Sequence, residues 1–393
     1  MDVFARASAG YGPAMDLSFL RDVLAAPAPT STIFIDASRD AEDAEHEVRR
    51  RWQALADRLR EQGASAEDVD ALAAAATAPT GHAGQAARLV AARGGRVVLD
   101  EVLPTGVPDG IGTATVGPFP DVTPLLAHHQ GDVPFVVARV SRTGAQVETY
   151  VRGASLDEAP AEAETVKGGT FYITKVHAGG WADLRYDHTV EETWKQTGQQ
   201  VAEAVVQQAH QHGARLVVMA GDVRARNAVR AALPATYDVV EVEGDVLAAG
   251  ASEQGLETAV QEAVAHRVNA DLDTLTDRLA MAGSAGGPGA AAPDLPHTVA
   301  ALQQGQAAVV VLDPPSLRTR TLVVGPAAHD VALPGGPRTW EGDGVDAPAD
   351  LALLRAAVLT DAEVELLPGA AGLPDGVAAV LRWDTGQPVG TLP

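Results

Sequence analysis

The sequence predicts an α/β protein of three domains, in each of which helices pack on a mixed sheet. Short runs of β-branched residues alternate with helical patterns along the chain, as they do in α/β layer structures. A length of 393 residues corresponds to two or three domains of about 150 residues each. We expect the domains to span residues 1–130, 131–275 and 276–393.

The first domain opens on a short β-branched and aromatic run at 31–36, which is typical of a buried strand. Apolar residues then recur at spacings of three and four, which predicts amphipathic helices. A glycine pair separates two further apolar runs and predicts a hairpin. We expect helices at 41–62 and 65–76, hairpin strands at 87–92 and 96–100, and a glycine- and proline-rich connector or edge structure at 104–124.

The middle domain opens on the clearest hairpin of the chain, with period-two alternation around a glycine turn. Strands and helices alternate after it, and Asp222 is placed to cap a helix. The domain boundary falls inside the last helix of this series. We expect hairpin strands at 134–140 and 145–151, helices at 190–212, 223–232 and 252–280, and strands at 215–220 and 237–242.

The last domain follows a low-complexity segment, 283–293, that is rich in glycine and alanine. It again alternates strand and helix patterns and predicts a small α/β layer structure. We expect helices at 297–304 and 350–359, strands at 307–312, 321–324, 363–367 and 377–383, and a glycine- and proline-rich segment at 333–348.

Charge and composition narrow the range of functions. The formal net charge is −23, which opposes unassisted long-range attraction to nucleic acid or to an anionic membrane surface. The chain has no cysteine, which excludes disulfides, thiolate zinc sites and cysteine nucleophiles. It shows no apolar run long enough to span a membrane and no basic and apolar leader in residues 1–10, so we expect a cytoplasmic protein.

Standard catalytic signatures are missing from the sequence. It has no Walker loop and no G-x-S-x-G elbow, and His46-Glu47 lacks the second histidine of a zinc-protease helix. The pairs His128-His129 and His210 with His212 lie in polar surroundings that favour a surface position over a metal site. We therefore assign no catalytic residue, no metal and no cofactor.

The segment 175–188 is unusual because it combines adjacent glycines with a tryptophan and cationic residues. Adjacent glycines allow the backbone to approach a ligand closely, and aromatic and cationic groups beside them suit an RNA contact. Residues 174–230 carry seven Lys or Arg and six Asp or Glu, so this region escapes the overall acidity. It is either a structural turn or a loop facing nucleic acid. Its candidate contacts are Lys175, His177, Gly179, Gly180, Trp181 and Arg185.

From about Pro134 onward the chain resembles the class-1 release factors of eukaryotes and archaea and their Pelota relatives. The resemblance is to the bacterial branch, which includes Balon-type ribosome hibernation factors. It is carried by four stretches in order, 177–181, 216–222, 250–256 and 376–383. The N-terminal part, with Thr32-Ile-Phe-Ile-Asp36, resembles the bacterial branch alone. The resemblance implies release-factor-like and Pelota-like middle and C-terminal domains.

The family resemblance also implies a place of action. It implies occupancy of the ribosomal A site, with Gly179-Gly180-Trp181 near the tRNA acceptor end and the N-terminal domain toward the decoding centre. It further implies a translational GTPase, such as elongation factor Tu, as a partner. Local arginines would have to offset the net negative charge at rRNA. The candidates, each equally explained as salt-bridged surface, are Arg49, Arg50, Arg51, Arg88, Arg93 and Arg96.

The chain departs from this family at Trp181, which stands where the family has the glutamine of its Gly-Gly-Gln motif. That glutamine positions a water for attack on the ester of peptidyl-tRNA, whereas indole offers one N–H donor and no acceptor. The resemblance therefore implies a hibernation or rescue factor that does not hydrolyse the ester. Two alternatives stay open, an active peptidyl-tRNA hydrolase and a stress-related binding protein that acts away from the ribosome.

Overall fold

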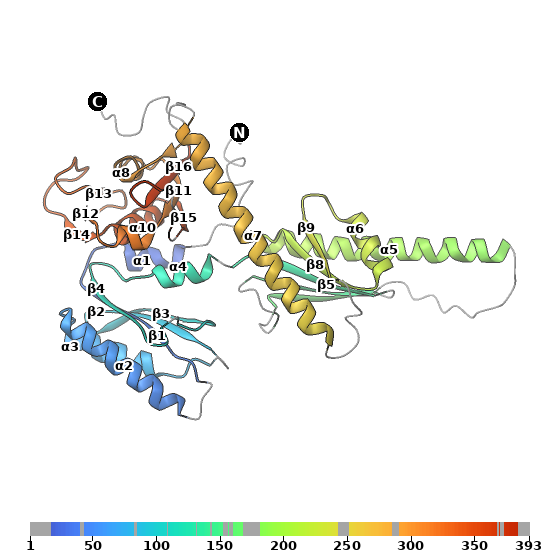
Figure 1. Cartoon of the computed structure of the whole chain (residues 1–393), viewed down its shortest axis with the longest axis horizontal. Helices are drawn as coiled ribbons and strands as arrows, with labels where there is room; N and C mark the ends of the chain where they lie inside the picture. The colour runs from blue at the N-terminus through green and yellow to red at the C-terminus, as the bar shows by residue number, and fades with distance from the viewer. Residues whose placement is uncertain are drawn as a thin grey trace. The chain divides into compact units, whose positions relative to one another are not determined.

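The computed structural model describes residues 17–383, except 40–42, 82–84, 108, 131, 142–143, 152–155, 157–159, 168–180, 243–250, 285–290, 368 and 370–372. The chain forms two compact units (Figure 1). The middle unit contains Gly131–Thr274, and the composite unit contains Met15–Gln130 together with Leu275–Pro393. Both units combine sheets with packed helices, so the predicted α/β class is confirmed.

The middle unit is built on a five-stranded sheet in the order β7-β6-β5-β8-β9. Its strands are β5 (Phe135–Ser141), β6 (Gly144–Tyr150), β7 (Glu162–Lys167), β8 (Leu216–Gly221) and β9 (Asp238–Val242). The predicted hairpin is confirmed, since β5 and β6 pair antiparallel with Phe135 opposite Tyr150. β5 also pairs parallel with β8, and β8 parallel with β9.

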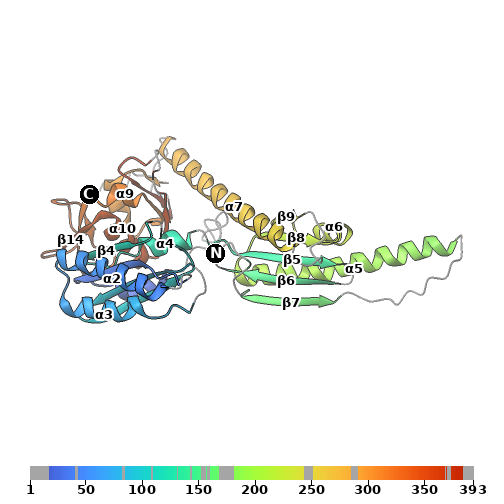
Figure 2. The ribbon, with the colours of Figure 1, turned by 60° about the horizontal axis from the view of Figure 1, so that its bottom comes forward.

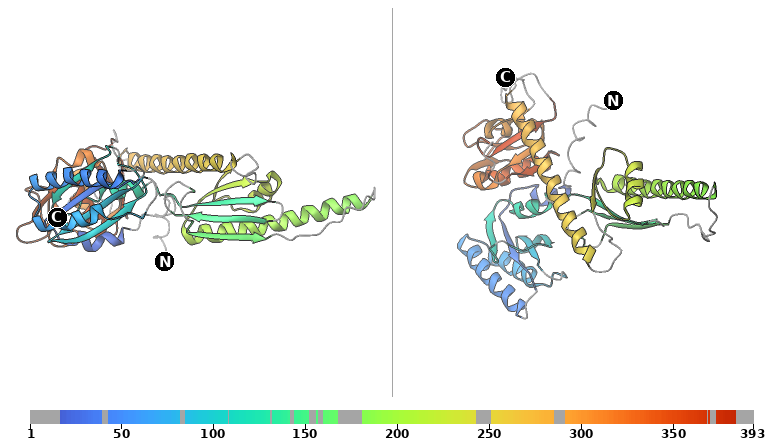
Figure 3. Two further views of the ribbon diagram at one scale, coloured as in Figure 1. Left: turned by 90° about the horizontal axis from the view of Figure 1, so that it is seen from below. Right: turned by 45° about the vertical axis from the view of Figure 1, so that its right-hand side comes forward.

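Helices cover both faces of this sheet (Figure 3). One face packs against α5 (Trp181–His212) and α6 (Val223–Ala232), and its core includes Val136, Val147 and Val217. The other face packs against the first part of α7 (Ala251–Ser284), with Phe135, Tyr150 and Leu216 in its core. This division follows the alternation of side chains along each strand. α5 begins at Trp181, earlier than the predicted start at 190.

The N-terminal part of the composite unit is an antiparallel sheet in the order β3-β2-β1-β4. Its strands are β1 (Thr30–Asp36), β2 (Ala87–Arg93), β3 (Arg96–Leu103) and β4 (Gly112–Gly117). The two predicted helices are confirmed as α2 (Ala44–Glu61) and α3 (Ala66–Thr77), and they cover one face of the sheet (Figure 1). Short helices η2 (Ser18–Leu20), α1 (Arg21–Leu24) and α4 (Thr123–His129) complete this part.

The C-terminal part of the composite unit contains two small sheets. One is the mixed sheet β10-β16-β11-β15, formed by β10 (Ala291–Ala292), β11 (Ala307–Leu312), β15 (Glu363–Leu366) and β16 (Val377–Leu381). The other is β13-β12-β14, formed by β12 (Thr321–Val324), β13 (Val331–Ala332) and β14 (Val345–Pro348). The helices are α8 (Leu295–Gln303), α9 (Pro314–Leu317) and α10 (Ala349–Leu359).

The two parts of the composite unit share one apolar core, in which Leu24 and Phe119 join α10 residues such as Leu353. Arg355 of α10 is fully buried in it. Its guanidinium donates to the carbonyl oxygens of Leu24 (3.0 Å), Ala25 (2.9 Å), Ala327 (3.1 Å) and Pro326 (3.3 Å). A single cation therefore satisfies backbone carbonyls from both ends of the sequence.

Gln130 makes a second connection between the two parts. Its side-chain Nε2 donates to the carbonyl oxygen of Leu366 at 2.7 Å, and its Oε1 accepts from the Leu366 backbone N–H at 2.8 Å. Leu366 is the last residue of β15, an outer strand of its sheet. The amide of Gln130 therefore pairs with that strand much as a neighbouring backbone would.

Among the described residues, no helix is both long enough and apolar enough to cross a membrane.

Candidate functional site

α5 starts at Trp181, which follows the glycine pair of the candidate segment in the sequence. Lys175, His177, Gly179 and Gly180 lie outside the described residues. Trp181 and Arg185 belong to the first turns of α5, although the described side chains of this helix begin at Lys195. The assignment of these residues to a tRNA or rRNA contact stays a prediction.

The C-terminal half of α5 anchors the helix on its sheet. Val201, Val205 and Ala209 recur at helical spacing and are each at most 1% exposed. They pack on strand residues such as Val147 and Val217. The N-terminal half of α5 continues past the ends of the strands in Figure 2. The packed half therefore sets the direction in which the start of the helix points.

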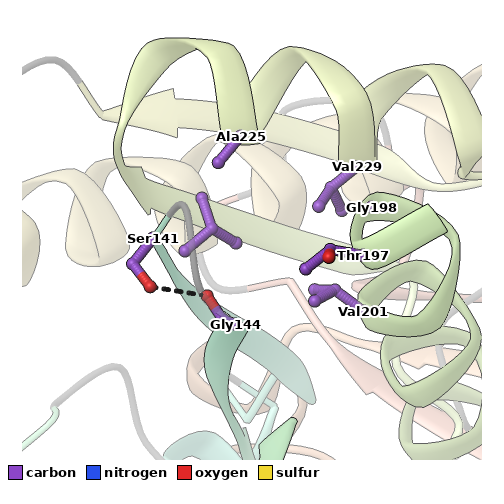
Figure 4. A pocket seen from close by; sticks show the side chains of 8 residues that line it. Ser141, Gly144, Thr197, Gly198, Val201, Ala225 and Val229 are labelled. Atoms are coloured by element: carbon purple, nitrogen blue, oxygen red, sulfur yellow. Dashed lines mark hydrogen bonds between the residues drawn. The ribbon is translucent and has the colours of Figure 1, made fainter. Parts of the chain in front are cut away.

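α5 crosses α6 at a position that only glycine fits. A Cβ on Gly198 would lie 2.8 Å from the Cβ of Ala228 and 2.9 Å from its carbonyl carbon. Beside this contact is a small pocket, formed largely by apolar side chains of both helices and by the end of the β5–β6 hairpin (Figure 4). Its residues are Val140, Ser141, Gly144, Thr197, Gly198, Val201, Ala225 and Val229. The crossing fixes α5 close to where it leaves the sheet.

The turn between β8 and α6 is also constrained by its residue types. Gly221 has φ +116°, and a Cβ there would lie 1.9 Å from the carbonyl oxygen of Val140. Asp222 then caps α6, because its Oδ1 accepts from the backbone N–H groups of Arg224 (3.0 Å) and Ala225 (3.2 Å). The predicted cap is confirmed, and it fixes the start of α6.

A polar cluster lies on the opposite face of the sheet, among Arg139, Glu148 and Tyr150. Arg139 forms an ion pair with Glu148, and the Tyr150 hydroxyl donates to the same carboxylate at 3.2 Å. Burial, and after it the nearby Glu148 carboxylate, raises the pKa of Tyr150 to about 12. Tyr150 also stacks on Phe135 with ring centroids 5.0 Å apart. The phenol is therefore a neutral part of the core at physiological pH.

The candidate arginines of α2 all lie beside carboxylates of the composite unit. The nearest distances are 3.7 Å from Arg49 to Glu45, 2.5 Å from Arg50 to Glu47 and 3.5 Å from Arg51 to Asp36. Arg49 and Arg50 are exposed, whereas the Arg51 side chain is only 20% exposed. Exposed pairs at helical spacing are weak, so Arg49 and Arg50 remain accessible to a partner.

The candidate arginines of the β2–β3 hairpin differ in accessibility. Arg88 is buried, and its Nε and Nη2 donate to the two carboxylate oxygens of Asp100, at 2.7 and 2.8 Å. Arg93 donates to the Thr30 hydroxyl and the Val23 carbonyl, and burial lowers its pKa. Arg96 is exposed at the start of β3. Of this set, Arg96 is the side chain that faces solvent.

The histidine pairs occupy different settings. His128 and His129 lie at the end of α4, with ring centroids 5.3 Å apart in an edge-to-face arrangement. His212 ends α5, and its Nε2 lies 3.0 Å from a Glu162 carboxylate oxygen on β7. His210 is exposed on the last turn of α5.

Sequence reasoning does not single out Gly198, although a lone glycine inside a helical pattern is a signal of close packing.

Comparison with known proteins agrees with the sequence resemblance. Residues 134–285 match the family model "Bacterial archaeo-eukaryotic release factor family 2". An uncharacterized protein of Mycobacterium tuberculosis is 26% identical over 369 residues, which cover 93% of this chain and 96% of that protein.

Two solved structures are similar at lower identity. One is an archaeal translation termination factor, at 15% identity, with 93% of this chain and 96% of that chain covered and a TM-score of 0.22. The other is a ribosome-bound archaeal Pelota, at 13% identity, with 94% of each chain covered and a TM-score of 0.36. The family match spans the candidate loop, α5 and α6. On this match, residues 134–285 form a domain of the bacterial archaeo-eukaryotic release factor family 2.

Proposed function

We propose that the protein is a cytoplasmic, ribosome-associated translation factor that binds the A site as a hibernation or rescue factor and does not hydrolyse peptidyl-tRNA. One observation carries the proposal. The family match over 134–285 includes Gly179-Gly180-Trp181, and the anchored helix α5 starts at Trp181. A contact loop directly before a rigid helix is suited to reaching into a narrow site.

The chemistry of Trp181 supports binding over hydrolysis. An indole ring offers a large stacking surface and one N–H donor, and it has no oxygen to hold a water in line with an ester. Stacking on a base contributes about 1–3 kcal/mol in single-stranded contacts. Trp181 is thus suited to hold an RNA end and unsuited to activate water.

Electrostatics require that the contacts be local, because the net charge is −23. The exposed members of the predicted set, Arg49, Arg50 and Arg96, are the ones we propose for rRNA. Arg88 is held by Asp100 and is left out of the proposal. As the partner for delivery we propose a translational GTPase such as elongation factor Tu, to be tested by co-purification with and without a non-hydrolysable GTP analogue.

The test is co-sedimentation of the purified protein with vacant 70S ribosomes at low and moderate salt. Peptide release from peptidyl-tRNA is scored in parallel on loaded ribosomes. We expect binding that weakens with salt, without release. Release by the wild-type protein would favour the hydrolase alternative, and absence of binding at both salt concentrations would favour a function away from the ribosome.

A Trp181→Gln variant sharpens this test because it restores the Gly-Gly-Gln sequence of the family. If Trp181 is what prevents hydrolysis, the variant should release peptide above the wild-type background while still binding. A Trp181→Ala variant is the matched control, since it removes the indole without supplying an amide.

A further inference from the structure

The outward face of α6 has a charge pattern unlike that of the whole chain. The helix reads VRARNAVRAA and carries three arginines and no acidic residue, in a protein of net charge −23. Arg224, Asn227 and Arg230 are all exposed, at spacings of three that place them along one side of the helix. Val223, at the start of this face, is 57% exposed.

The third arginine of α6, Arg226, lies on the side of the helix that packs on the sheet. Arg226 is only 6% exposed and lies 3.2 Å from the Glu241 carboxylate on β9. Together with the buried Val229 it belongs to the side that packs on the sheet. Arg226 thus faces the sheet, whereas the exposed Arg224 and Arg230 lie on the other side of the helix.

The position of α6 links this face to the candidate loop. Gly198 and Ala228 bring α5 and α6 into direct backbone contact, so the two helices hold a fixed orientation. Lys195, three residues before Gly198, is exposed on α5. The face thus lies on a helix packed against α5, which begins at Trp181.

We propose that Arg224, Asn227 and Arg230 form a docking face for the phosphate backbone of RNA. The inference rests on the proposed function and adds a second contact surface to the middle unit. Arginine and asparagine side chains are common donors to phosphate oxygens, and such contacts position a protein without reading sequence. A protein partner would need a larger apolar centre than one valine provides. RNA is therefore the occupant that this surface fits best.

The first experiment measures the salt dependence of ribosome binding for an Arg224→Gln and Arg230→Gln double variant. Removing one arginine–phosphate interaction should lower the slope of log affinity against log salt by about 0.7–0.9. We expect the slope to fall by about 1.5 and binding at moderate salt to weaken at least tenfold. Both side chains are exposed, so unfolding by urea should be unchanged. Arg230→Lys should retain most of the affinity because it retains the charge.

The matched control is Arg60→Gln, an exposed helical arginine of α2 in the composite unit. It removes one positive charge, as Arg230→Gln does, and should leave the slope unchanged. If Arg60→Gln and Arg230→Gln weaken binding equally, the effect is one of net charge and the docking face is refuted.

The second experiment uses the absence of cysteine from the chain. Ala231 is exposed on α6 beside Arg230, and an Ala231→Cys variant would accept an iron chelate at that single thiol. We expect hydroxyl-radical cleavage of rRNA in the bound complex. Cross-linking of the same thiol to a ribosomal protein without cleavage of rRNA would show that the occupant is a protein and would overturn the RNA assignment.

The outcomes separate this inference from the proposed function. If the wild-type protein binds and the double variant binds equally well with the same slope, the α6 face is refuted and the proposed function stands. If the wild-type protein does not bind ribosomes, both are refuted together.

Discussion

Arg318 and Asp121 form an ion pair across 197 positions of the sequence, with Nη1 2.5 Å from Oδ2. The Nε of the same guanidinium donates to buried Asp350 at 2.6 Å. Burial raises the pKa of Asp350, and the positive charge of Arg318 opposes that rise. This network, together with Arg355 and the shared apolar core, joins the two parts of the composite unit. These two parts pack as one body. The division of the chain into three domains stays a prediction.

Arg355 should be the most sensitive arginine of the composite unit. Arg355→Met would leave four backbone carbonyls without their donors in a buried site, and unmet buried acceptors are costly. We expect the free energy of unfolding to fall by about 2–4 kcal/mol, measured by urea denaturation. Arg49→Met, which changes an exposed arginine, should change it by less than about 0.5 kcal/mol. Equal effects of the two variants would mean that the buried hydrogen bonds contribute little.

The α5–α6 crossing gives a second stability prediction. Gly198→Ala places a Cβ 2.8 Å from the Cβ of Ala228, so the helices must move apart, at a cost of about 1–3 kcal/mol. Gly255→Ala is the control, because a Cβ on that glycine of α7 meets nothing within 4 Å. Alanine favours the helix there and should stabilise the protein by about 0.5–1 kcal/mol. In thermal or urea unfolding, the two variants should change the stability of the protein in opposite directions. A stabilising Gly198→Ala would contradict the close contact.

Tyr150 makes stability depend on alkaline pH. Its pKa is raised to about 12 in the folded protein, so the unfolded chain loses the phenolic proton first as pH rises above 10. The stability that Tyr150 contributes is complete below pH 10 and is lost as pH rises toward 12. At pH 11 the loss should be on the order of 1 kcal/mol. Tyr150→Phe should lack this part of the decline when urea unfolding is compared at pH 9 and pH 11, and parallel declines would argue against the raised pKa.

Trp181 gives the prediction closest to function. Trp181→Ala should weaken ribosome binding by about 5- to 150-fold, because the variant lacks a stacking interaction of about 1–3 kcal/mol. Trp181→Phe retains an aromatic face and should restore most of the affinity. Binding constants of the wild-type protein and both variants, measured by sedimentation at one fixed salt concentration, would test this prediction. Unchanged binding by the alanine variant would assign Trp181 to internal packing.

The sequence predicts the buried strands and amphipathic helices well because the apolar or polar character of each residue follows the burial of its side chain. Val136, Val217 and Val310 lie in short runs rich in β-branched residues, which are typical of strands inside a sheet. The prediction from sequence fails where a strand forms through pairing with neighbouring strands and has no residue pattern of its own. β7 carries mostly exposed polar residues, and β13 has only two residues, so neither shows an alternating pattern. The predicted start of α5 is too late because the adjacent glycines of the segment 175–188 predict a turn or loop there.

The candidate site was predictable in part, for a related reason. The residue types of 175–188 leave a structural turn and a loop facing nucleic acid both open. Residues 181–188 belong to α5, and 175–180 lie outside the described residues. For the arginines, pairing depends on tertiary contacts. Arg88 meets Asp100 through the register of the β2–β3 hairpin, and Arg226 of α6 meets Glu241 of β9. The residue types alone specify neither pairing. The outward direction of Arg224 and Arg230 likewise follows from how α6 lies on its sheet, which helical spacing alone does not settle.

The amide of Gln130 has a consequence for how molecules of this protein meet one another. An outer strand with an open N–H and C=O is a template for another chain, and growth from such an edge leads to aggregation. Gln130 engages both groups of Leu366 at the end of β15. A residue from the N-terminal part of the chain thus occupies the N–H and C=O groups of Leu366, so these two groups are not open to pairing with a second molecule.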